Sequence, residues 1–195
     1  MTVAGLVLAA GSGSRYGGPK ALVPFEGELL VERAARLLAE GGCAPVLVVL
    51  GASAERVRAA AVLPEVVVAG DWSTGMGASL RAGLAALEPR SQVQACVVAL
   101  VDQPRVGPVA VERLVAAFGA GAPAAVATYD GAPRNPVLLA RRTWAGVAEL
   151  AQGDAGARAW LRAHPADVVE VPCDGTGSAA DIDTPDDLTT LLAAR

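Results

Sequence analysis

The chain has 195 residues and a formal net charge of −4. Its length suits one compact domain over residues 1–195 with a substantial core. Although 53% of its residues are apolar, no apolar run approaches the roughly 20 residues of a membrane span, and no signal-peptide pattern precedes the first strand. We therefore expect a cytoplasmic protein without a membrane partner. The acidic balance, with no block of basic residues, argues against nucleic acid as a partner.

Histidine and cysteine are scarce. The one histidine, His164, precedes Pro165 at the expected end of a helix, where a cation is favourable, and we interpret it as structural. Cys43, Cys96 and Cys173 form no Cys-x-x-Cys pair, so we expect reduced, buried thiols. A histidine-dependent hydrolase and a zinc site are disfavoured, and any metal should be a hard cation on carboxylates, Mg²⁺ or Mn²⁺.

Short β-branched runs alternate with helical patterns along the chain. Strands are expected at Val3–Ala9, Pro45–Leu50, Glu65–Ala69, Ala95–Leu100, Ala124–Tyr129, Pro136–Leu139 and Val168–Val171. Helices are expected at Leu29–Gly41, Ala54–Val62, Gly77–Leu87, Val109–Gly119, Thr143–Ala151, Ala155–Ala163 and Thr184–Ala194. This order predicts an α/β fold: a single three-layer domain, with a mostly parallel sheet and helices on both faces. The Asp130-Gly131 pair predicts a hairpin within residues 125–139.

The first strand leads into a glycine-rich loop with two cations. Residues 8–20 read Leu-Ala-Ala-Gly-Ser-Gly-Ser-Arg-Tyr-Gly-Gly-Pro-Lys. Glycines let backbone N–H groups turn toward a ligand, and successive N–H groups form an anion-binding concavity. Because Arg15 and Lys20 add full positive charges, the loop predicts a polyphosphate site, with a mobile surface loop as the alternative.

Two well-known phosphate-binding patterns do not fit this loop. A Walker loop needs Gly-Lys-Ser/Thr, whereas Pro19 separates Gly18 from Lys20 and an alanine follows. The dinucleotide pattern needs a third glycine where Tyr16 stands. It also needs an acid at the end of the second strand, where this chain has leucine and glycine. A nicotinamide-dependent oxidoreductase is therefore disfavoured.

Two acids follow predicted strands at their carboxyl ends, where ligands of open α/β sheets bind. Asp102 ends one strand, where its carboxylate would project toward the ligand crevice, although it could instead cap the next helix. Asp71 opens the segment Asp-Trp-Ser-Thr-Gly-Met-Gly-Ala-Ser-Leu, which leads into a helix whose N-terminus could face phosphates. A plain loop is the alternative there, with Trp72 covering the sheet edge.

Residues 181–187 read Asp-Ile-Asp-Thr-Pro-Asp-Asp and begin the last helix. Thr184 is the expected N-cap and Pro185 the first helical residue, and the two acids that follow complement the helix dipole. None of these roles requires Asp183. Asp181 is interpreted as structural.

The loop at residues 8–20 resembles the pattern Leu-Ala-Ala-Gly-x-Gly-x-Arg-x-Gly-x-Pro-Lys, with one extra residue. That pattern is found in the nucleotidyltransferase family of molybdenum cofactor cytidylyl- and guanylyltransferases and sugar-phosphate nucleotidyltransferases. Segments 75–80, 102–104 and 181–185 also resemble this family, and segments 134–138 and 153–158 resemble its cytidylyltransferase branch. The resemblance covers nearly the whole chain and implies a Rossmann-like nucleotidyltransferase fold.

The resemblance also implies roles for individual residues. Asp102 and Asp183 would bind the catalytic Mg²⁺, or Mn²⁺ in its place, and the catalytic residues would be Arg15, Lys20 and Asp102. The acceptor would contact Arg134 and Asn135. The nucleotide would contact Leu8, Ala9, Ala10, Gly11, Gly13, Arg15, Lys20, Asp71, Gly75, Met76, Gly77 and Ser79.

The implied reaction is that of a molybdenum cofactor cytidylyltransferase, in which the terminal phosphate of molybdopterin attacks the α-phosphorus of CTP and releases pyrophosphate. That phosphate is already an anion, so catalysis needs positioning and charge neutralisation rather than a base. Cytidylyltransferases of the family begin the loop with Leu-Ala-Ala-Gly, as here, and the methyl group of Ala10 favours a pyrimidine. A molybdoenzyme or its chaperone is a candidate partner.

Two departures leave alternatives open. Many members of the cytidylyltransferase branch have histidine where Asn135 stands, so the acceptor stays uncertain. Guanylyltransferases carry an asparagine near Gly51 that this chain lacks, which argues against GTP. The alternatives are a guanylyltransferase using GTP, a sugar-1-phosphate nucleotidyltransferase and a non-catalytic nucleotide- or pterin-binding module.

Overall fold

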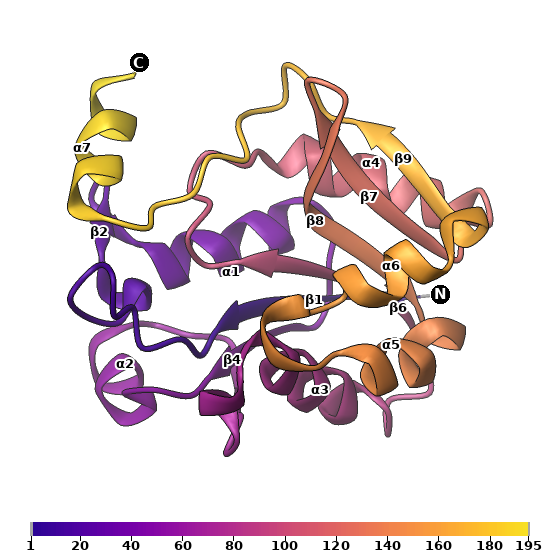
Figure 1. Cartoon of the computed structure of the whole chain (residues 1–195), viewed down its shortest axis with the longest axis horizontal. Coiled ribbons are helices and arrows are strands. Elements are labelled where there is room, and N and C mark those ends of the chain that lie inside the picture. The colour runs from indigo at the N-terminus through magenta and orange to yellow at the C-terminus, as the bar shows by residue number, and fades with distance from the viewer. Residues whose placement is uncertain (1, 195) are drawn as a thin grey trace.

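A seven-stranded sheet forms the centre of the computed structural model, which describes residues 2–194 (Figure 1). Its strands are β1 (Thr2–Ala9), β4 (Val46–Leu50), β5 (Glu65–Val68), β6 (Val93–Leu100), β7 (Ala124–Tyr129), β8 (Ala132–Ala140) and β9 (Val168–Pro172). They lie in the order β5-β4-β1-β6-β8-β7-β9. Strand β8 runs antiparallel to both of its neighbours, and the other pairs are parallel. The predicted three-layer α/β fold with a mostly parallel sheet is confirmed.

Helices cover both faces of this sheet. They are α1 (Leu30–Glu40), α2 (Ala54–Ala60), α3 (Met76–Leu87), α4 (Pro108–Gly119), α5 (Trp144–Leu150), α6 (Arg158–Ala163) and α7 (Pro185–Ala193). Single turns of 3-10 helix occur at Lys20–Leu22, Trp72–Thr74, Arg141–Thr143, Gly153–Ala155 and Pro165–Asp167. Within residues 2–194, no helix has the length and apolar character needed to cross a membrane.

Strand β1 contributes to a hydrophobic core on each face of the sheet, because successive side chains of a strand point to opposite faces. Val3 and Val7 belong to the buried cluster that includes residues of α1 and α4. Ala4 and Leu6 belong to the second cluster, with residues of α3 and α5. Both faces of the strand are therefore buried, which matches its nearly continuous apolar sequence.

The predicted hairpin between β7 and β8 is confirmed. Asp130 and Gly131 have φ angles of 51° and 71°, as the favoured two-residue hairpin turn requires. Strand β8 begins at Ala132 rather than at Pro136, because residues 132–134 pair with β7 although their sequence does not alternate.

Sequence patterns missed one hairpin and misplaced one helix start. Strands β2 (Pro24–Phe25) and β3 (Glu28–Leu29) have two residues each, too few to show a period. The helix expected from Ala155 begins only at Arg158, because Gly156 has a φ of 52°, outside the helical region.

The predicted position of His164 at a helix end and the predicted burial of the three cysteines are confirmed. His164 is the C-cap of α6; its ring stacks on Trp160 with centroids 4.4 Å apart, and its Nδ1 lies 3.0 Å from the Trp160 carbonyl oxygen. Cys43, Cys96 and Cys173 are all free and buried.

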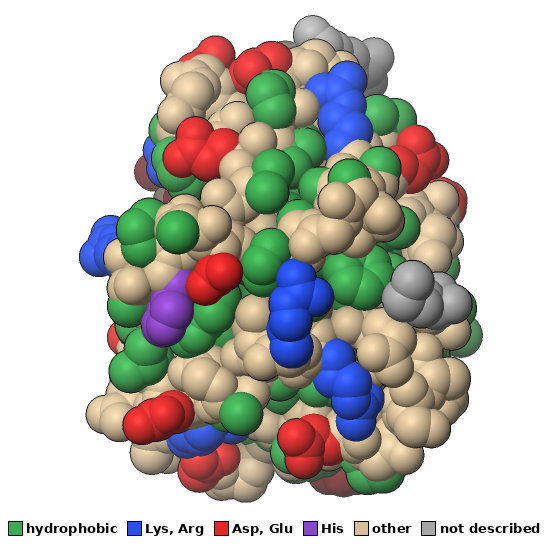
Figure 2. Space-filling view, turned by 90° about the vertical axis from the view of Figure 1, so that its right-hand side faces the viewer, with side chains coloured by type: hydrophobic (Ala, Val, Ile, Leu, Met, Phe, Trp, Pro, Cys, Tyr) green, Lys and Arg blue, Asp and Glu red, His purple; other side chains and the backbone are tan. Residues whose placement is uncertain are grey.

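Charges of both signs are interspersed on the face of the molecule drawn in Figure 2. On this face, basic and acidic side chains alternate with apolar and neutral ones, and no basic stripe crosses this side of the described residues.

Candidate active site

The loop after β1 is closed by the carbonyl of Gly13. That oxygen accepts hydrogen bonds from the N–H groups of Tyr16, Gly17 and Gly18 at 3.0, 2.9 and 3.2 Å. Gly13 has a φ of 65°, and a Cβ on it would lie 1.8 Å from the carbonyl oxygen of Gly18, so only glycine fits. Among the hydrogen bonds of residues 2–194, none is donated by the backbone N–H groups of residues 11–15. The backbone N–H groups of the first half of the loop therefore remain available to bind an anion, whereas those of residues 16–18 are already bonded to the Gly13 carbonyl.

Four charged side chains from three distant segments meet beside this loop. Lys20, the only lysine of the chain, donates from Nζ to Asp102 Oδ2 at 2.8 Å and to Asp183 Oδ1 at 2.6 Å. Arg15 Nη1 lies 2.9 Å from Asp183 Oδ2. The structure thus brings together the two predicted metal ligands and the two predicted phosphate-binding cations.

Lys20 and Asp183 stabilise each other's charged forms, and Asp102 adds a second negative charge beside the Lys20 ammonium. Burial alone would lower the pKa of Lys20, but the hydrogen bonds and negative charges of Asp102 and Asp183 together raise it. The Lys20 hydrogen bond in turn lowers the pKa of Asp183. Asp102 retains one buried carboxylate oxygen, Oδ1, for which the described residues supply no hydrogen-bond partner. A buried acceptor of this kind indicates room for a further donor or a cation.

Asp102 does not cap the helix that follows it. Helix α4 begins at Pro108, and its N-cap is Gly107. Asp102 is held instead at the carboxyl end of β6, where its carbonyl accepts a hydrogen bond from Ile182 N–H at 2.8 Å. This bond brings the 181–184 segment to the end of β6, while Thr184 caps α7 and Pro185 begins it, as predicted.

A cavity of about 350 Å³ opens beside the cluster. Of the residues predicted to act at the site, these line it: Leu8, Ala9, Ala10, Gly11, Gly13, Arg15, Lys20, Gly75, Met76, Ser79 and Asp102. The lining combines cations, a glycine loop and apolar side chains. A volume in this range suits part of a small-molecule ligand.

Several predicted residues do not line this cavity. Asp71 is exposed and pairs with Arg81, with Asp71 Oδ2 and Arg81 Nη2 2.9 Å apart. Gly77 packs against the chain itself, since a Cβ on it would lie 2.3 Å from the Ala151 carbonyl oxygen. Arg134 and Asn135 lie on β8, and Arg134 is exposed. Asp183 does not line the cavity, but its carboxylate pairs with Lys20 and Arg15, which do.

Among the lining residues that the sequence did not predict, Trp72 has the largest aromatic side chain and Asp154 supplies an additional carboxylate. Trp72 lines the cavity and packs over the end of β4, because a Cβ on Gly51 would lie 2.4 Å from the Trp72 Cβ. Asp154 lines it too, with Oδ1 3.4 Å from Met76 N. The resemblance at residues 153–158 marked the Asp154 segment without indicating its role.

Asp102 and Asp183 form a pair of carboxylates and not a complete set of metal ligands. No group of three or more His, Cys, Asp or Glu side chains that could hold a metal occurs within residues 2–194. Magnesium, however, is commonly held by one or two carboxylates together with substrate phosphates and water. Asp102 and Asp183, with the unpartnered Asp102 Oδ1, fit a cation that binds together with a triphosphate.

Comparison with known proteins gives a match over most of the chain. The family model of the MobA-like NTP transferase domain matches residues 5–168. The protein named nicotine blue oxidoreductase, from Paenarthrobacter nicotinovorans, is 41% identical over 200 residues, covering 97% of this chain and 96% of its own.

Solved structures share the whole fold. Rv0371c from Mycobacterium tuberculosis H37Rv has a TM-score of 0.87 at 32% identity, covering 99% of this chain and 98% of its own. A complex of Rv0371c with manganese has a TM-score of 0.84 at 30% identity, with 100% of both chains covered. Molybdopterin-guanine dinucleotide biosynthesis protein A from Archaeoglobus fulgidus shares the fold, with a TM-score of 0.70 at 22% identity over 100% of this chain and 98% of its own.

Proposed function

The chain belongs to the MobA-like NTP transferase family, and we propose that it transfers CMP from CTP to the terminal phosphate of a molybdopterin-type acceptor. The observation that carries this proposal is the bridge from Lys20 Nζ to Asp102 and Asp183 beside the glycine loop. This arrangement combines anion-binding donors, a cation and two metal-type carboxylates at one cavity, as nucleotidyl transfer requires.

In the proposed reaction an acceptor phosphate oxygen attacks the α-phosphorus. A new P–O bond forms there, the bond to the bridging oxygen breaks, and pyrophosphate leaves. The free N–H groups of residues 11–15 would hold phosphate oxygens, while Arg15 and Lys20 would neutralise the leaving pyrophosphate. No side chain needs to remove a proton, because the attacking phosphate is already ionised.

A divalent cation, Mg²⁺ or Mn²⁺, would be held by Asp102 and Asp183 and would draw charge from the phosphate oxygens as a Lewis acid. Asp102 Oδ1 is the oxygen free to receive it. The structure of the homologous Rv0371c with manganese supports divalent metal use in this family.

The preference for CTP rests on the space around the base. Ala10 lines the cavity, so its methyl group narrows the turn that follows β1. Trp72 fills the space over Gly51 where guanylyltransferases carry an asparagine nearby. A single methyl group discriminates by about 1–3 kcal/mol at most, so the preference for CTP over GTP should be incomplete.

For the acceptor, we propose contacts with Arg134 and Asn135. The product would pass to a molybdoenzyme or its chaperone.

Pyrophosphate release decides between the nucleotides. The purified protein is incubated with each nucleoside triphosphate and Mg²⁺, with and without molybdopterin, and pyrophosphate is measured. We expect release with CTP that depends on molybdopterin, weaker release with GTP, and a smaller gap between them in Ala10→Gly. A native preference for GTP would refute the cytidylyl assignment, and release that needs a sugar 1-phosphate instead would refute the acceptor.

An oxidoreductase is the second candidate, because a relative 41% identical carries that name. Against a nicotinamide cofactor, β4 ends in Leu50 and Gly51, so no acid stands there to bind a ribose. One experiment distinguishes the two functions. Nicotine blue is added to the protein with NADH or NADPH in the absence of any nucleoside triphosphate, and oxidation of the NADH or NADPH is followed. Turnover under those conditions, with no pyrophosphate release under the others, would replace the transferase proposal.

A further inference from the structure

Helix α7 carries Asp183 directly before its N-terminus, yet it has weak support from packing. None of the residues of α7 (Pro185–Ala193) is fully buried, although Leu188 and Leu191 pack against the core edge. A helix of nine residues has little stability of its own in water. Polar contacts are therefore needed, in addition to the packing of these two leucines, to hold α7 and with it Asp183 in place.

Those contacts come from the loop that follows Asp102. Along the loop, Gln103 Nε2 donates to the Ala179 carbonyl at 3.1 Å, and Ser178 N–H donates to the Arg105 carbonyl at 2.9 Å. Figure 1 shows the segment between β9 and α7 crossing the molecule to reach this loop. The main chain of residues 177–182 is thereby fastened to residues 102–106.

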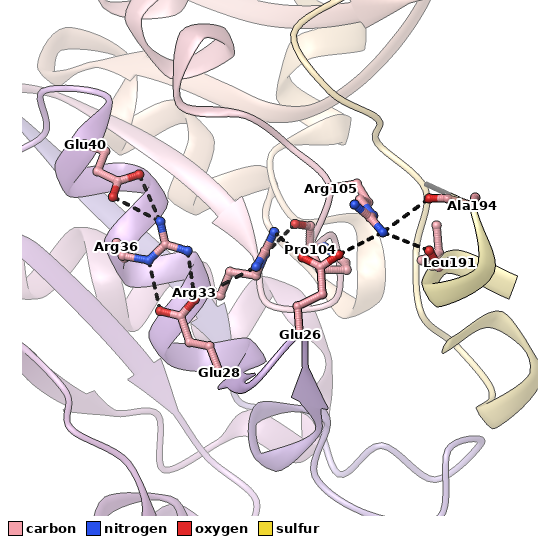
Figure 3. Close-up of polar contacts among 9 residues, drawn as sticks. All are labelled: Glu26, Glu28, Arg33, Arg36, Glu40, Pro104, Arg105, Leu191 and Ala194. Carbon is pink, nitrogen blue, oxygen red and sulfur yellow. Dashed lines mark hydrogen bonds and ion pairs between the residues drawn. The ribbon is translucent and has the colours of Figure 1, made fainter. Parts of the chain in front are cut away.

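Arg105 extends this attachment to the far end of α7. Its Nη2 donates to the carbonyl oxygens of Leu191 at 3.0 Å and Ala194 at 3.3 Å (Figure 3). These are carbonyls of the last helical turn, which lack partners within the helix and favour a cation. The side chain of Arg105, three residues after Asp102, thus holds the C-terminal end of α7, while Asp183 lies just before the N-terminal end.

The Arg105 guanidinium is itself held in position. Its Nη2 lies 3.0 Å from Glu26 Oε1, and Glu26 Oε2 lies 3.2 Å from Arg33 Nη2 (Figure 3). The guanidinium carbons of Arg105 and Arg33 lie 5.1 and 5.0 Å from the centroid of the buried Phe25 ring. Arg33 also donates to the Pro104 carbonyl at 2.7 Å. The β2–β3 hairpin and α1 thus orient Arg105 through charge and cation–π contacts.

We propose that Arg105 is a positioning residue, which clamps the C-terminal end of α7 to the loop after Asp102 and so holds Asp183 against Lys20. Glu26 is its orienting partner. The effect on turnover rests on the proposed function, whereas the effect on α7 and on Lys20 does not. Arg105 does not line the cavity, so its proposed effect on the reaction is indirect and passes through the position of Asp183.

The test uses Arg105→Met in the full chain with three measurements. Hydrogen exchange over residues 185–193 reports attachment of α7. Acylation of Lys20 by an N-hydroxysuccinimide ester, read by peptide mass, reports the Asp183 contact without ambiguity, because the chain has no other lysine. Pyrophosphate release from CTP reports kcat and KM. Arg142→Met is the matched control, because Arg142 Nη2 makes the same kind of contact with the Gly121 carbonyl, at 3.1 Å, near the end of α4.

We expect about tenfold faster exchange over α7 and several-fold faster Lys20 acylation in Arg105→Met, since hydrogen bonds to charged groups are lost. The kcat should fall by about tenfold, with the KM for CTP little changed, and Arg142→Met should match wild type. Unchanged exchange over α7, or faster exchange with unchanged Lys20 acylation, would overturn the clamp. Unchanged kcat would overturn its role in positioning.

Failure of the proposed function can be distinguished from failure of the clamp. If wild type releases no pyrophosphate from any triphosphate, the proposed function fails, while exchange and acylation still decide the clamp. If Arg105→Met does not fold, Glu26→Gln removes the orienting charge and should shift exchange and acylation in the same direction by a smaller factor. No shift in Glu26→Gln would overturn the proposal.

Discussion

At the scale of single residues, the site is built around one amine and two carboxylates. Lys20 Nζ lies between Asp102 and Asp183, which we propose as the ligands of a divalent cation, and it neutralises charges that would otherwise repel each other. A metal that binds the two acids must therefore compete with Lys20 or displace it. Once displaced toward the loop, the ammonium group is free to contact phosphate.

Lys20→Met should separate these two roles. We expect Mn²⁺ to bind about tenfold more tightly in the absence of nucleotide, because a competing positive charge is removed. Triphosphate binding should instead weaken, by about 2–4 kcal/mol if the site is dry. Isothermal titration of each ligand measures both, with the exposed Arg56→Met as a control for net charge. A parallel loss of both affinities would contradict the competition.

Asp102→Asn should abolish turnover while the fold is kept. The substitution removes the negative charge at the end of β6 without changing the volume of the side chain, so we expect an unchanged circular dichroism spectrum and loss of metal-dependent pyrophosphate release. Asp186→Asn is the matched control, since Asp186 is an exposed acid of the first turn of α7. Activity of Asp102→Asn near the wild-type value at saturating Mg²⁺ would rule out Asp102 as a metal ligand.

At the scale of elements, two loops close one side of the cavity by direct backbone contact. A Cβ on Gly75 would lie 2.4 Å from the carbonyl carbon of Gly153, and Gly75 has a φ of 115°. Gly77, at the start of α3, approaches the Ala151 carbonyl in the same way. These glycines bring Met76 and Asp154 together at the cavity, while the nucleotide contact of Gly77 stays a prediction.

Gly77→Ala should push these loops apart. Because the added methyl group meets backbone, which cannot rotate away, we expect a loss of about 1–3 kcal/mol in unfolding free energy and weaker CTP binding. Gly119→Ala, at the end of α4, meets nothing within 4 Å and should be neutral or stabilising. Thermal unfolding and CTP titration of both variants make the comparison. Equal stability of the two variants would contradict the close approach.

At the scale of the whole molecule, buried thiols couple stability to alkaline pH. Burial raises the pKa of Cys43 to about 12, and burial also raises the pKa values of Cys96 and Cys173. The unfolded chain therefore loses thiol protons from about pH 9, before the folded protein does. Since the unfolded state then binds fewer protons, the free energy of unfolding falls as pH rises.

Cys43→Ala should reduce that pH dependence. Between about pH 9 and the native pKa of Cys43, one thiol contributes a loss of up to about 1.4 kcal/mol per pH unit. Urea unfolding in the presence of a reductant at pH 8, 9.5 and 10.5 measures the slope for wild type and variant. The variant starts from its own stability at pH 8, so only the slopes are compared. Equal slopes would mean that Cys43 ionises in the folded protein as readily as in the unfolded chain.

The sequence by itself determined what depends on neighbours along the chain. Apolar periodicity located the seven main strands, the Asp130-Gly131 pair located the hairpin turn, and the glycine loop with Arg15 and Lys20 located a candidate phosphate site. These features are local, because side-chain alternation, positive φ angles and loop composition are set within a few residues. Two-residue strands such as β2 and β3 carry too little pattern to be recognised this way.

Only the tertiary structure decided which distant residues meet. Resemblance suggested Asp183 as a ligand, but its contact with Lys20 spans 163 residues and depends on the strand order and on the clamp of α7. The lining roles of Trp72 and Asp154 arise because separate loops approach one another at backbone distance. The close packing that brings such segments together depends on complementary shapes across the core, and periodicity along the chain does not encode those shapes.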